Sequence, residues 1–280
     1  MGGRLFIWLQ YILPQHAVSR LILAATRVRA AWFKNALTRG FLALYTVDMS
    51  EAVEPDPYRY ESFNAFFTRA LAPGCRPIAT AAGAITSPVD GTVSESGAIR
   101  QNALLQAKGR EYTLGDLLAA QDWANRFENG TFATIYLAPY NYHRIHLPLD
   151  ARLLETVYVP GRLFSVNAVT ARHVPGLFAR NERVLTLFDS AAGSFALVLV
   201  GALNEGSMAT VWAGDITPAK RRAVSRLPPV SWRGAKGDEL GRFNMGSTVI
   251  LLFEPGRAAW DARLVTGACV RLGERIGELR

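Results

Sequence analysis

Residues 244–253 read Asn-Met-Gly-Ser-Thr-Val-Ile-Leu-Leu-Phe, a Gly-Ser turn signal followed by a β-branched, aliphatic and aromatic run. The run Thr248–Phe253 has the composition of a strand. Comparable runs occur at residues 131–137, 153–159, 183–188, 195–200 and 208–212, with Gly, Pro, Asn and Asp between them. Their even spacing, with few long helical patterns between them, predicts a mainly antiparallel β-sheet core.

The first fifty residues have a different pattern. Residues 4–46 read as helices, with an apolar stripe on one face and regularly spaced cations on another. The stripe consists of Leu21, Ala25, Val28 and Trp32, and the cations are Arg20, Arg27 and Lys34. Such a helix can lie flat on a membrane, with its apolar side in the acyl boundary. The alternative is an ordinary surface helix packed on the protein's own core.

The charge distribution favours a membrane surface as the partner. The net charge is +8, and residues 1–50 hold six Lys and Arg residues against Asp48 alone, which gives +5. Because this segment is also rich in apolar residues, a membrane surface is favoured over nucleic acid. We expect no signal peptide and no membrane span, since the longest uncharged stretch, Leu5–Ser19, is broken by Pro14 and a span needs about 20 apolar residues.

These patterns together predict an α+β protein in two parts. We expect an N-terminal helical membrane-association segment at residues 1–50 and a catalytic domain at residues 51–280. Within the second part, residues 51–60 read as a linker and Ser62 is expected to cap a short helix over residues 63–71. Two further helices are expected near residues 114–120 and 166–170.

The chain has two cysteines, Cys75 and Cys269. They form no metal-type cluster and no disulfide framework. A disulfide between them is possible but is not implied, and a reducing compartment is the simpler interpretation.

The first segment with possible chemistry is Ser87-Pro88-Val89-Asp90-Gly91-Thr92. Asp-Gly between apolar residues is a hairpin signal, because Asp tolerates the turn. The functional alternative is that Asp90 is a carboxylate that orients a histidine.

The second segment is Tyr142-His143-Arg144-Ile145-His146-Leu147-Pro148. On a strand, side chains three residues apart face opposite sides, whereas on a helix they share a face and can bind a metal. Pro139 and Pro148 make a long helix unfavourable, and no third ligand lies nearby, so we expect no metal. The two histidines are then either packed side chains, or one of them is a catalytic base.

The third segment is Asn244-Met245-Gly246-Ser247-Thr248. It differs from the Gly-x-Ser-x-Gly elbow of esterases, because no Gly follows two residues after the Ser. The simplest interpretation is a turn that enters a strand. The functional alternative uses Gly246, whose missing side chain leaves its carbonyl open to attack by the Ser247 hydroxyl.

The three segments occur in the order and approximate spacing of the bacterial pyruvoyl-dependent phosphatidylserine decarboxylases, which the chain resembles over nearly its whole length. Gly-Ser-Thr is similar to the self-cleavage signature of that family. The resemblance extends to residues 9–14, 105–109, 158–161, 163–167, 178–183 and 211–214. Met245 stands where the family more often has Leu, a volume-conserving change that leaves the motif intact.

The resemblance implies that the chain cleaves itself between Gly246 and Ser247. Asp90, His146 and Ser247 match the family's Asp–His–Ser set, with His146 as the base and Asp90 holding its tautomer. The products are a β chain, residues 1–246, and an α chain, residues 247–280, in which the former Ser247 is a pyruvoyl group.

The pyruvoyl group is the cofactor that the resemblance implies. It accepts the electrons released when phosphatidylserine loses CO2 and becomes phosphatidylethanolamine. His143 matches a family histidine linked to this second reaction, in substrate binding or proton donation. The family also implies a peripheral enzyme on the cytoplasmic face of the cell membrane, phosphatidylserine in anionic membranes as its partner, and a homodimer.

Four other functions remain open from the residues. A Ser-His-Asp hydrolase would use Asp90, His146 and Ser247 on an external ester and keep the chain intact. A self-cleaving decarboxylase of another amine would share every motif. A non-catalytic membrane-binding module would explain the N-terminus but not the three polar segments, and the intact Asp90, His146 and Ser247 argue against an inactive relative.

Overall fold

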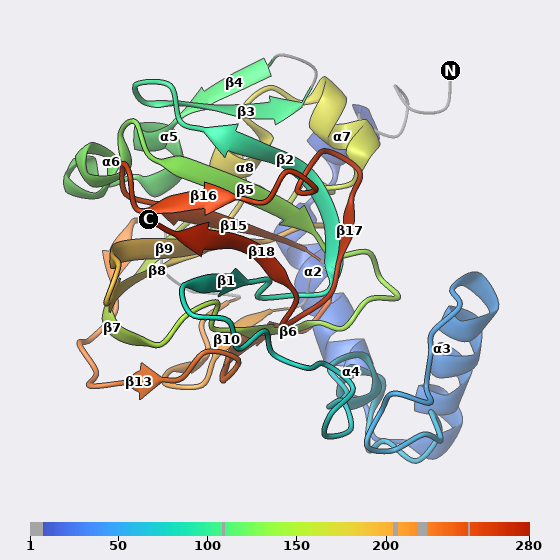
Figure 1. Ribbon diagram of the computed structural model, residues 1–280. Coiled ribbons are helices and arrows are strands. Elements are labelled where there is room, and N and C mark those ends of the chain that lie inside the picture. Colours follow the sequence, from blue (N-terminus) through green and yellow to red (C-terminus); the bar gives the residue numbers. More distant parts are fainter. Residues whose placement is uncertain (1–7, 108–109, 204–206, 218–222, 246) are drawn as a thin grey trace.

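The computed structural model describes residues 8–107, 110–203, 207–217, 223–245 and 247–280 (Figure 1). The strands of its largest sheet are β2 (Gly91–Ala98), β5 (Thr131–Tyr136), β7 (Ala151–Val159), β8 (Arg183–Ser190), β9 (Gly193–Val200), β12 (Ser225–Arg226), β13 (Arg233–Gly234), β15 (Thr248–Phe253) and β17 (Cys269–Val270). Their order is β12-β7-β8-β9-β15-β5-β2-β17, with β13 also on β7. Neighbouring strands pair antiparallel, as the sequence predicts.

Strand β15 lies inside this sheet, and its position explains its continuous apolar sequence. It pairs with β5 on one side and β9 on the other, so that Thr248 is opposite both Tyr136 and Val200. Alternate side chains of a strand face opposite sides of the sheet. Ile250 and Leu252 pack into the apolar cluster on one face of the sheet. Val249, Leu251 and Phe253 pack into a second apolar cluster on the other face. A strand with both faces buried therefore needs no polar alternation.

Smaller sheets flank the large one. Their strands are β1 (Ala84–Thr86), β16 (Ala258–Trp260) and β18 (Arg275–Leu279), ordered β1-β18-β16; β6 (Arg144–His146), β10 (Met208–Thr210), β11 (Gly214–Asp215) and β14 (Glu239–Phe243), ordered β11-β10-β14-β6; and the pair β3 (Ala103–Ala107) and β4 (Arg110–Thr113). The β6–β14 pair matters most for the site, because β14 leads along the chain to Ser247.

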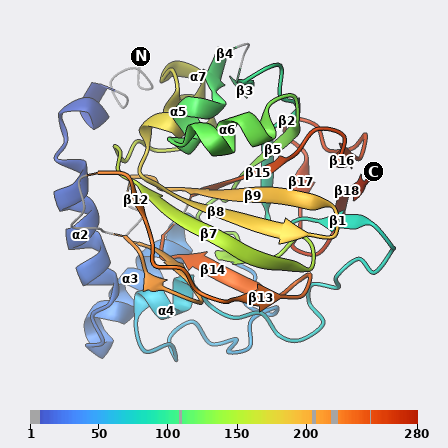
Figure 2. The ribbon, with the colours of Figure 1, turned by 90° about the vertical axis from the view of Figure 1, so that its left-hand side faces the viewer.

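Short helices cover one face of the large sheet (Figures 1 and 2). They are α5 (Leu114–Leu118), α6 (Gln121–Phe127), α7 (Ala168–His173) and α8 (Leu177–Arg180). Side chains from α5, α6, α7 and α8 join the same apolar cluster as Ile250. The helices expected near residues 114–120 and 166–170 are confirmed.

Helix α4 (Phe63–Phe67) begins as expected and ends early. The Ser62 hydroxyl accepts a hydrogen bond from the amide of Ala65 at 3.1 Å, which confirms the cap. The helix ends at Phe67, not at residue 71, because Leu71 forms a β-bridge with Ala52 of the linker and must be extended.

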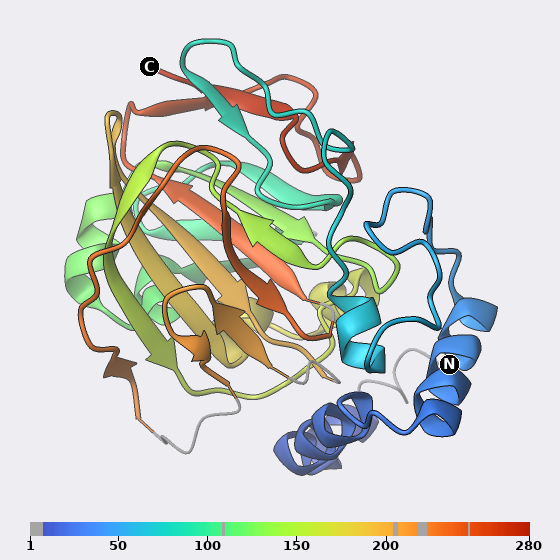
Figure 3. The same cartoon turned by 90° about the horizontal axis from the view of Figure 1, so that it is seen from below.

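The N-terminal helices lie at one end of the molecule, away from the C-terminus (Figures 2 and 3). They are α2 (Gln15–Thr26) and α3 (Ala31–Leu44), so the predicted stripe crosses a break at residues 27–30 and is not one continuous helix. The Thr26 hydroxyl bonds back to the Leu23 carbonyl at 3.0 Å, where the helix ends.

The side of α2 that faces the protein is mostly polar. Gln15, Ser19 and Thr26 are buried there, and the Gln15 side chain accepts a hydrogen bond from the amide of Leu163 at 2.9 Å. By contrast, three of the four side chains expected to form the stripe are exposed, with exposed fractions of 71% for Leu21, 37% for Val28 and 77% for Trp32, while Ala25 is half-buried. Leu21, Val28 and Trp32 are therefore not core residues, whereas α2 itself packs on the protein through its opposite face.

No helix in the described part of the chain combines the length and the hydropathy needed to cross a bilayer.

Candidate active site

Three backbone hydrogen bonds hold the three segments singled out by the sequence, either to one another or to the neighbouring strands. The amide of His146 donates to the carbonyl of Pro88 at 2.9 Å, which brings the Asp90 segment beside β6. The amide of Phe243, at the end of β14, donates to the carbonyl of His143 at 3.0 Å. The amide of Leu137, just after β5, donates to the carbonyl of Ser247 at 2.8 Å. Segments far apart in sequence therefore meet at one end of β15.

Asp90 lies directly before β2 and is buried. The hairpin interpretation of Asp90-Gly91 is wrong, because β1 pairs with β18, whereas β2 pairs with β5 and β17. Gly91 is required here by close packing: a Cβ at this position would lie 2.5 Å from the Tyr136 carbonyl oxygen.

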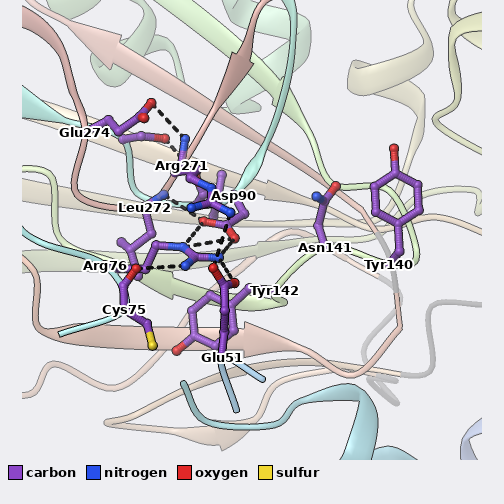
Figure 4. A network of polar contacts seen from close by, with 12 residues as sticks. Glu51, Cys75, Arg76, Asp90, Tyr140, Asn141, Tyr142, Arg271, Leu272 and Glu274 are labelled. Carbon is purple, nitrogen blue, oxygen red and sulfur yellow. Dashed lines mark hydrogen bonds and ion pairs between the residues drawn. The ribbon is translucent and has the colours of Figure 1, made fainter. Parts of the chain in front are cut away.

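The Asp90 carboxylate is held in a buried ionic network (Figure 4). The Arg76 guanidinium donates to both carboxylate oxygens, with Nη2 at 2.6 Å from Oδ2 and Nε at 3.0 Å from Oδ1. The amide of Leu272 adds a bond to Oδ1 at 2.8 Å. Arg76 also bonds Glu51 at 2.7 Å, and Arg271 reaches Glu51 at 3.2 Å. Burial opposes the charge of Arg76, but its bonds to the two carboxylates outweigh burial and raise its pKa.

The expected hydrogen bond between Asp90 and His146 is absent from the described part of the chain. The carboxylate oxygens bond Arg76 and Leu272, and the two ring nitrogens of His146 bond Gly237 and Tyr142 instead. Asp90 and His146 interact through space instead, and the Asp90 charge acts to raise the pKa of His146.

His146 ends β6 and makes two bonds through its ring. Its Nδ1 lies 2.8 Å from the carbonyl oxygen of Gly237, and its Nε2 lies 3.0 Å from the hydroxyl of Tyr142. Burial is the main influence on this side chain and lowers its pKa, so that the neutral imidazole is favoured. A neutral imidazole is the form in which His acts as a general base.

His143 is fully buried against an aromatic ring. Its ring lies 4.2 Å from that of Phe67, centroid to centroid, and Nδ1 is 2.8 Å from the carbonyl oxygen of Asn141. Since a carbonyl only accepts, Nδ1 carries the proton and Nε2 has a free lone pair. Nε2 is buried with no hydrogen-bond partner among the described residues. Burial lowers the pKa of His143 to about 3, and the charge of Arg69 adds to this effect.

Ser247 is fully buried immediately before β15. Its hydroxyl, like Nε2 of His143, has no hydrogen-bond partner within the described residues. Gly246, the other half of the expected cleavage site, lies outside the described residues. A buried hydroxyl without a partner costs stability, and the hydroxyl of the adjacent Thr248 is buried in the same way.

A cavity of about 510 Å3 opens beside this segment. Aromatic and apolar side chains dominate its lining, which includes Phe41, Tyr45, Phe67, Tyr136, Tyr140 and Met245. Met245 lies two residues from Ser247, and the ring of Phe67 also packs against that of His143. The cavity therefore borders both unpartnered polar groups through their neighbours.

Sequence reasoning missed the groups that surround the three motifs. Arg76, Glu51 and Gly237 come from segments without a recognisable signal, since a single Arg, Glu or Gly in a loop has no characteristic pattern. Tyr142 adjoins His143 in the quoted motif, and its position before the histidine pair was the available signal. In the described part of the chain no three His, Cys, Asp or Glu side chains are grouped as metal ligands, and Cys75 and Cys269 are both free.

Comparisons with known proteins identify the family. The profile of the family described as phosphatidylserine decarboxylase matches residues 63–278, and a profile described as PSD matches residues 5–46. The chain belongs to the phosphatidylserine decarboxylase family. Curated relatives of this family member are named phosphatidylserine decarboxylase proenzyme. One from Methylococcus capsulatus is 48% identical and one from Ectopseudomonas mendocina is 51% identical. The matches cover 99% of this chain and 97% and 99% of those relatives.

Proposed function

We propose that this chain cleaves itself at Gly246–Ser247 and then, with a pyruvoyl group derived from Ser247, converts phosphatidylserine to phosphatidylethanolamine and CO2. The observation that carries the proposal is the Ser247 hydroxyl, which is buried and without a partner among the described residues at the end of a central strand. The segments that hold Asp90, His143 and His146 are tied to the same place by backbone bonds.

The first reaction uses the chain's own residues. The Ser247 hydroxyl adds to the carbonyl of Gly246, and its proton passes to Nε2 of His146. The backbone amide becomes an ester, with the former Ser247 amino group freed. Asp90 remains with Arg76 and stabilises the imidazolium through its charge rather than through a direct bond.

The ester is then broken by β-elimination, which leaves a carboxylate on Gly246 and dehydroalanine at position 247. Hydrolysis of dehydroalanine releases ammonia and gives the pyruvoyl group. The products are the β chain, residues 1–246, and an α chain of 280 − 246 = 34 residues.

The fold supports retention of the α chain after cleavage. Its strand β15 is hydrogen-bonded to β5 and to β9, both of which belong to the β chain. The α chain also supplies the Leu272 amide to Asp90 and the Arg271 side chain to Glu51. Cleavage therefore leaves these contacts available to hold the α chain in the sheet.

In the second reaction, the pyruvoyl group would accept the electron pair that is released when the substrate carboxylate leaves as CO2. The pyruvoyl group would form at the buried position of Ser247, and the free Nε2 of His143 is available to bind the substrate. Since Nε2 has a lone pair and no proton, His143 accepts a hydrogen bond from the substrate. The aromatic cavity beside Met245 admits the lipid headgroup from the surface.

The N-terminal helices are proposed as the contact with anionic membranes on the cytoplasmic face. Leu21, Val28 and Trp32 are exposed, and cations lie in the same segment. Trp and Leu side chains at the acyl boundary, with Arg and Lys near the headgroups, are typical of helices that lie on a bilayer. We also propose a homodimer, on the strength of the family alone.

The test is intact-mass analysis of the purified protein beside Ser247→Ala. We expect two chains that divide between Gly246 and Ser247, the smaller with a serine-derived pyruvoyl at its N-terminus, and a single 280-residue chain for the variant. A single chain in both samples that a fluorophosphonate labels at Ser247 would instead support a Ser-His-Asp hydrolase. A cleaved protein that leaves phosphatidylserine unchanged but decarboxylates another amine would support a self-cleaving decarboxylase with a different substrate.

A further inference from the structure

The two hydrogen bonds of His146 fix its tautomer. A carbonyl oxygen only accepts, so the 2.8 Å contact with Gly237 shows that Nδ1 of His146 carries the proton. Nε2 is then the bare nitrogen, and the Tyr142 hydroxyl at 3.0 Å must donate to it. Gly237 has a φ of +93°, a backbone conformation that favours glycine, so the position of its carbonyl depends on this residue type.

Asp90 bonds neither ring nitrogen of His146. Its carboxylate is engaged by Arg76 and Leu272, and no bond joins it to His146 among the described residues. The task of holding the imidazole, given to a carboxylate in Ser-His-Asp triads, is therefore divided here between a backbone carbonyl and a phenol.

We infer that Tyr142 is a positioning residue for self-cleavage, whose hydroxyl holds the reactive nitrogen of His146 until Ser247 replaces it. The inference rests on the proposed function, because it takes His146 as the base. The phenol donates to the lone pair that must receive the Ser247 proton, so this bond has to be exchanged before attack. Until then the bond favours the neutral ring and keeps Nε2 from binding a proton from water.

The surroundings support a donor phenol and a neutral ring. Tyr142 is buried, and burial raises its pKa, so its hydroxyl keeps its proton. Burial lowers the pKa of His146, while the Glu239 and Asp90 carboxylates act in the opposite direction and Arg144 adds to the lowering. These charges come from β14, from the segment before β2 and from β6 itself, and they are unchanged when Tyr142 becomes Phe.

The sign of the effect of Tyr142→Phe follows. Loss of a hydrogen bond to the neutral form raises the pKa of His146. More of the base is then protonated at a given pH, so the acid limb of self-cleavage moves to higher pH, by about one unit for a bond of ordinary strength. Above that limb the variant still cleaves, because the base and the nucleophile are both present.

The kinetic test follows the full-length precursor made by cell-free translation and shifted to a series of pH values. Tyr58→Phe, an exposed linker tyrosine, is the matched control and should follow the wild type. An equal loss at every pH would show that Tyr142 acts only on the structure, and complete loss would place it on the proton path; either result overturns the inference. If His146→Gln cleaves like the wild type, the base assignment of the proposed function fails, whatever Tyr142 does.

A second measurement does not depend on cleavage. The chain has four histidines, so the ring nitrogens of the uncleaved Ser247→Ala precursor can be followed by 15N NMR, with His146→Gln for assignment. We expect the Nδ1–H tautomer at His146 and a midpoint about one pH unit higher when Tyr142→Phe is added. An unchanged midpoint, or an Nε2–H tautomer, would overturn the inference.

Discussion

The two sides of the site differ in how completely their polar groups are paired. On one side, both carboxylate oxygens of Asp90 accept hydrogen bonds, which Arg76 and the Leu272 amide donate. On the other, the Ser247 hydroxyl and Nε2 of His143 are buried without a hydrogen-bond partner among the described residues. His146 belongs to neither group, since both of its ring nitrogens are bonded to neutral groups.

This difference in pairing distinguishes residues that stabilise the fold from residues that take part in the reactions. A buried charge is tolerated only when it is paired and hydrogen-bonded, so the Asp90 side is built first of all to be stable. A buried polar atom without a partner costs stability, and at Ser247 and His143 the proposed reactions supply a use for it. We therefore expect substitutions on the Ser247 side to change reaction rates, and substitutions on the Asp90 side to change the free energy of unfolding as well.

The largest expected effect distinguishes the two histidines. His146→Gln should slow self-cleavage by about 10²–10⁴-fold, because the base is lost. His143→Gln should leave cleavage intact, since its Nε2 is free and its Nδ1 bonds only the Asn141 carbonyl. Precursor half-life and the release of CO2 from phosphatidylserine measure the two reactions separately.

His143→Gln should then release CO2 at least about tenfold more slowly, the loss expected for one substrate hydrogen bond. Slow cleavage in His143→Gln together with normal cleavage in His146→Gln would reverse the assignment. Equal losses of both reactions in both variants would show that the two sides act as one unit.

The sheet could be predicted from sequence because its strands are local patterns. Thr248–Phe253 and Arg183–Ser190 are continuous apolar or β-branched runs, and such runs need no partner to be recognised. The end of α4 was not predicted because it depends on a contact made elsewhere, and the break between α2 and α3 was not predicted because no helix-breaking residue marks it. Leu71 leaves the helix to bridge Ala52, and residues 27–30 have neither Gly nor Pro to mark the break.

The site could be predicted in its members but not in its bonds. Asp90, His143, His146 and Ser247 stand in motifs, and backbone pairing brings their segments together. The partner of each side chain is set by the tertiary structure. The triad pattern predicted His146 as the partner of Asp90, whereas in the fold its partner is Arg76. A pattern of residue types contains no information on which of two nearby donors a carboxylate will face.

The second expected effect concerns the stability of the Asp90 side. Arg76→Met should lower the free energy of unfolding by about 3–5 kcal/mol, because Asp90 would remain buried without its main partner. The measurement is denaturant unfolding of the uncleaved Ser247→Ala precursor, so that cleavage does not affect the comparison. Arg59→Met, at an exposed linker position, is the control and should change stability by less than about 1 kcal/mol.

Equal stability of Arg76→Met and Arg59→Met would remove the proposed contrast between the two sides. The double variant Arg76→Met/Asp90→Asn sharpens it, because it removes the uncompensated charge. We expect it to recover part of the loss, and no recovery would mean that the guanidinium stabilises the fold through packing or through Glu51 alone.

The smallest expected effect lies outside the sheet. Leu21→Ser/Trp32→Ser removes two exposed apolar side chains from α2 and α3 and should weaken binding to anionic vesicles by at least about tenfold, through lost apolar contact with the bilayer. Self-cleavage should keep its wild-type half-life, because neither side chain belongs to the site. Vesicle co-sedimentation and precursor half-life measure the two properties.

Val265→Ser is the matched control for this comparison. Val265 is also an exposed apolar residue, but it lies on the loop between β16 and β17, away from α2 and α3 (Figure 2). If both variants lose vesicle binding equally, general surface hydrophobicity governs binding and the helices have no special role. If only the helix variant loses binding while its cleavage persists, contact with the bilayer and formation of the cofactor are separate properties of two separate parts of the chain.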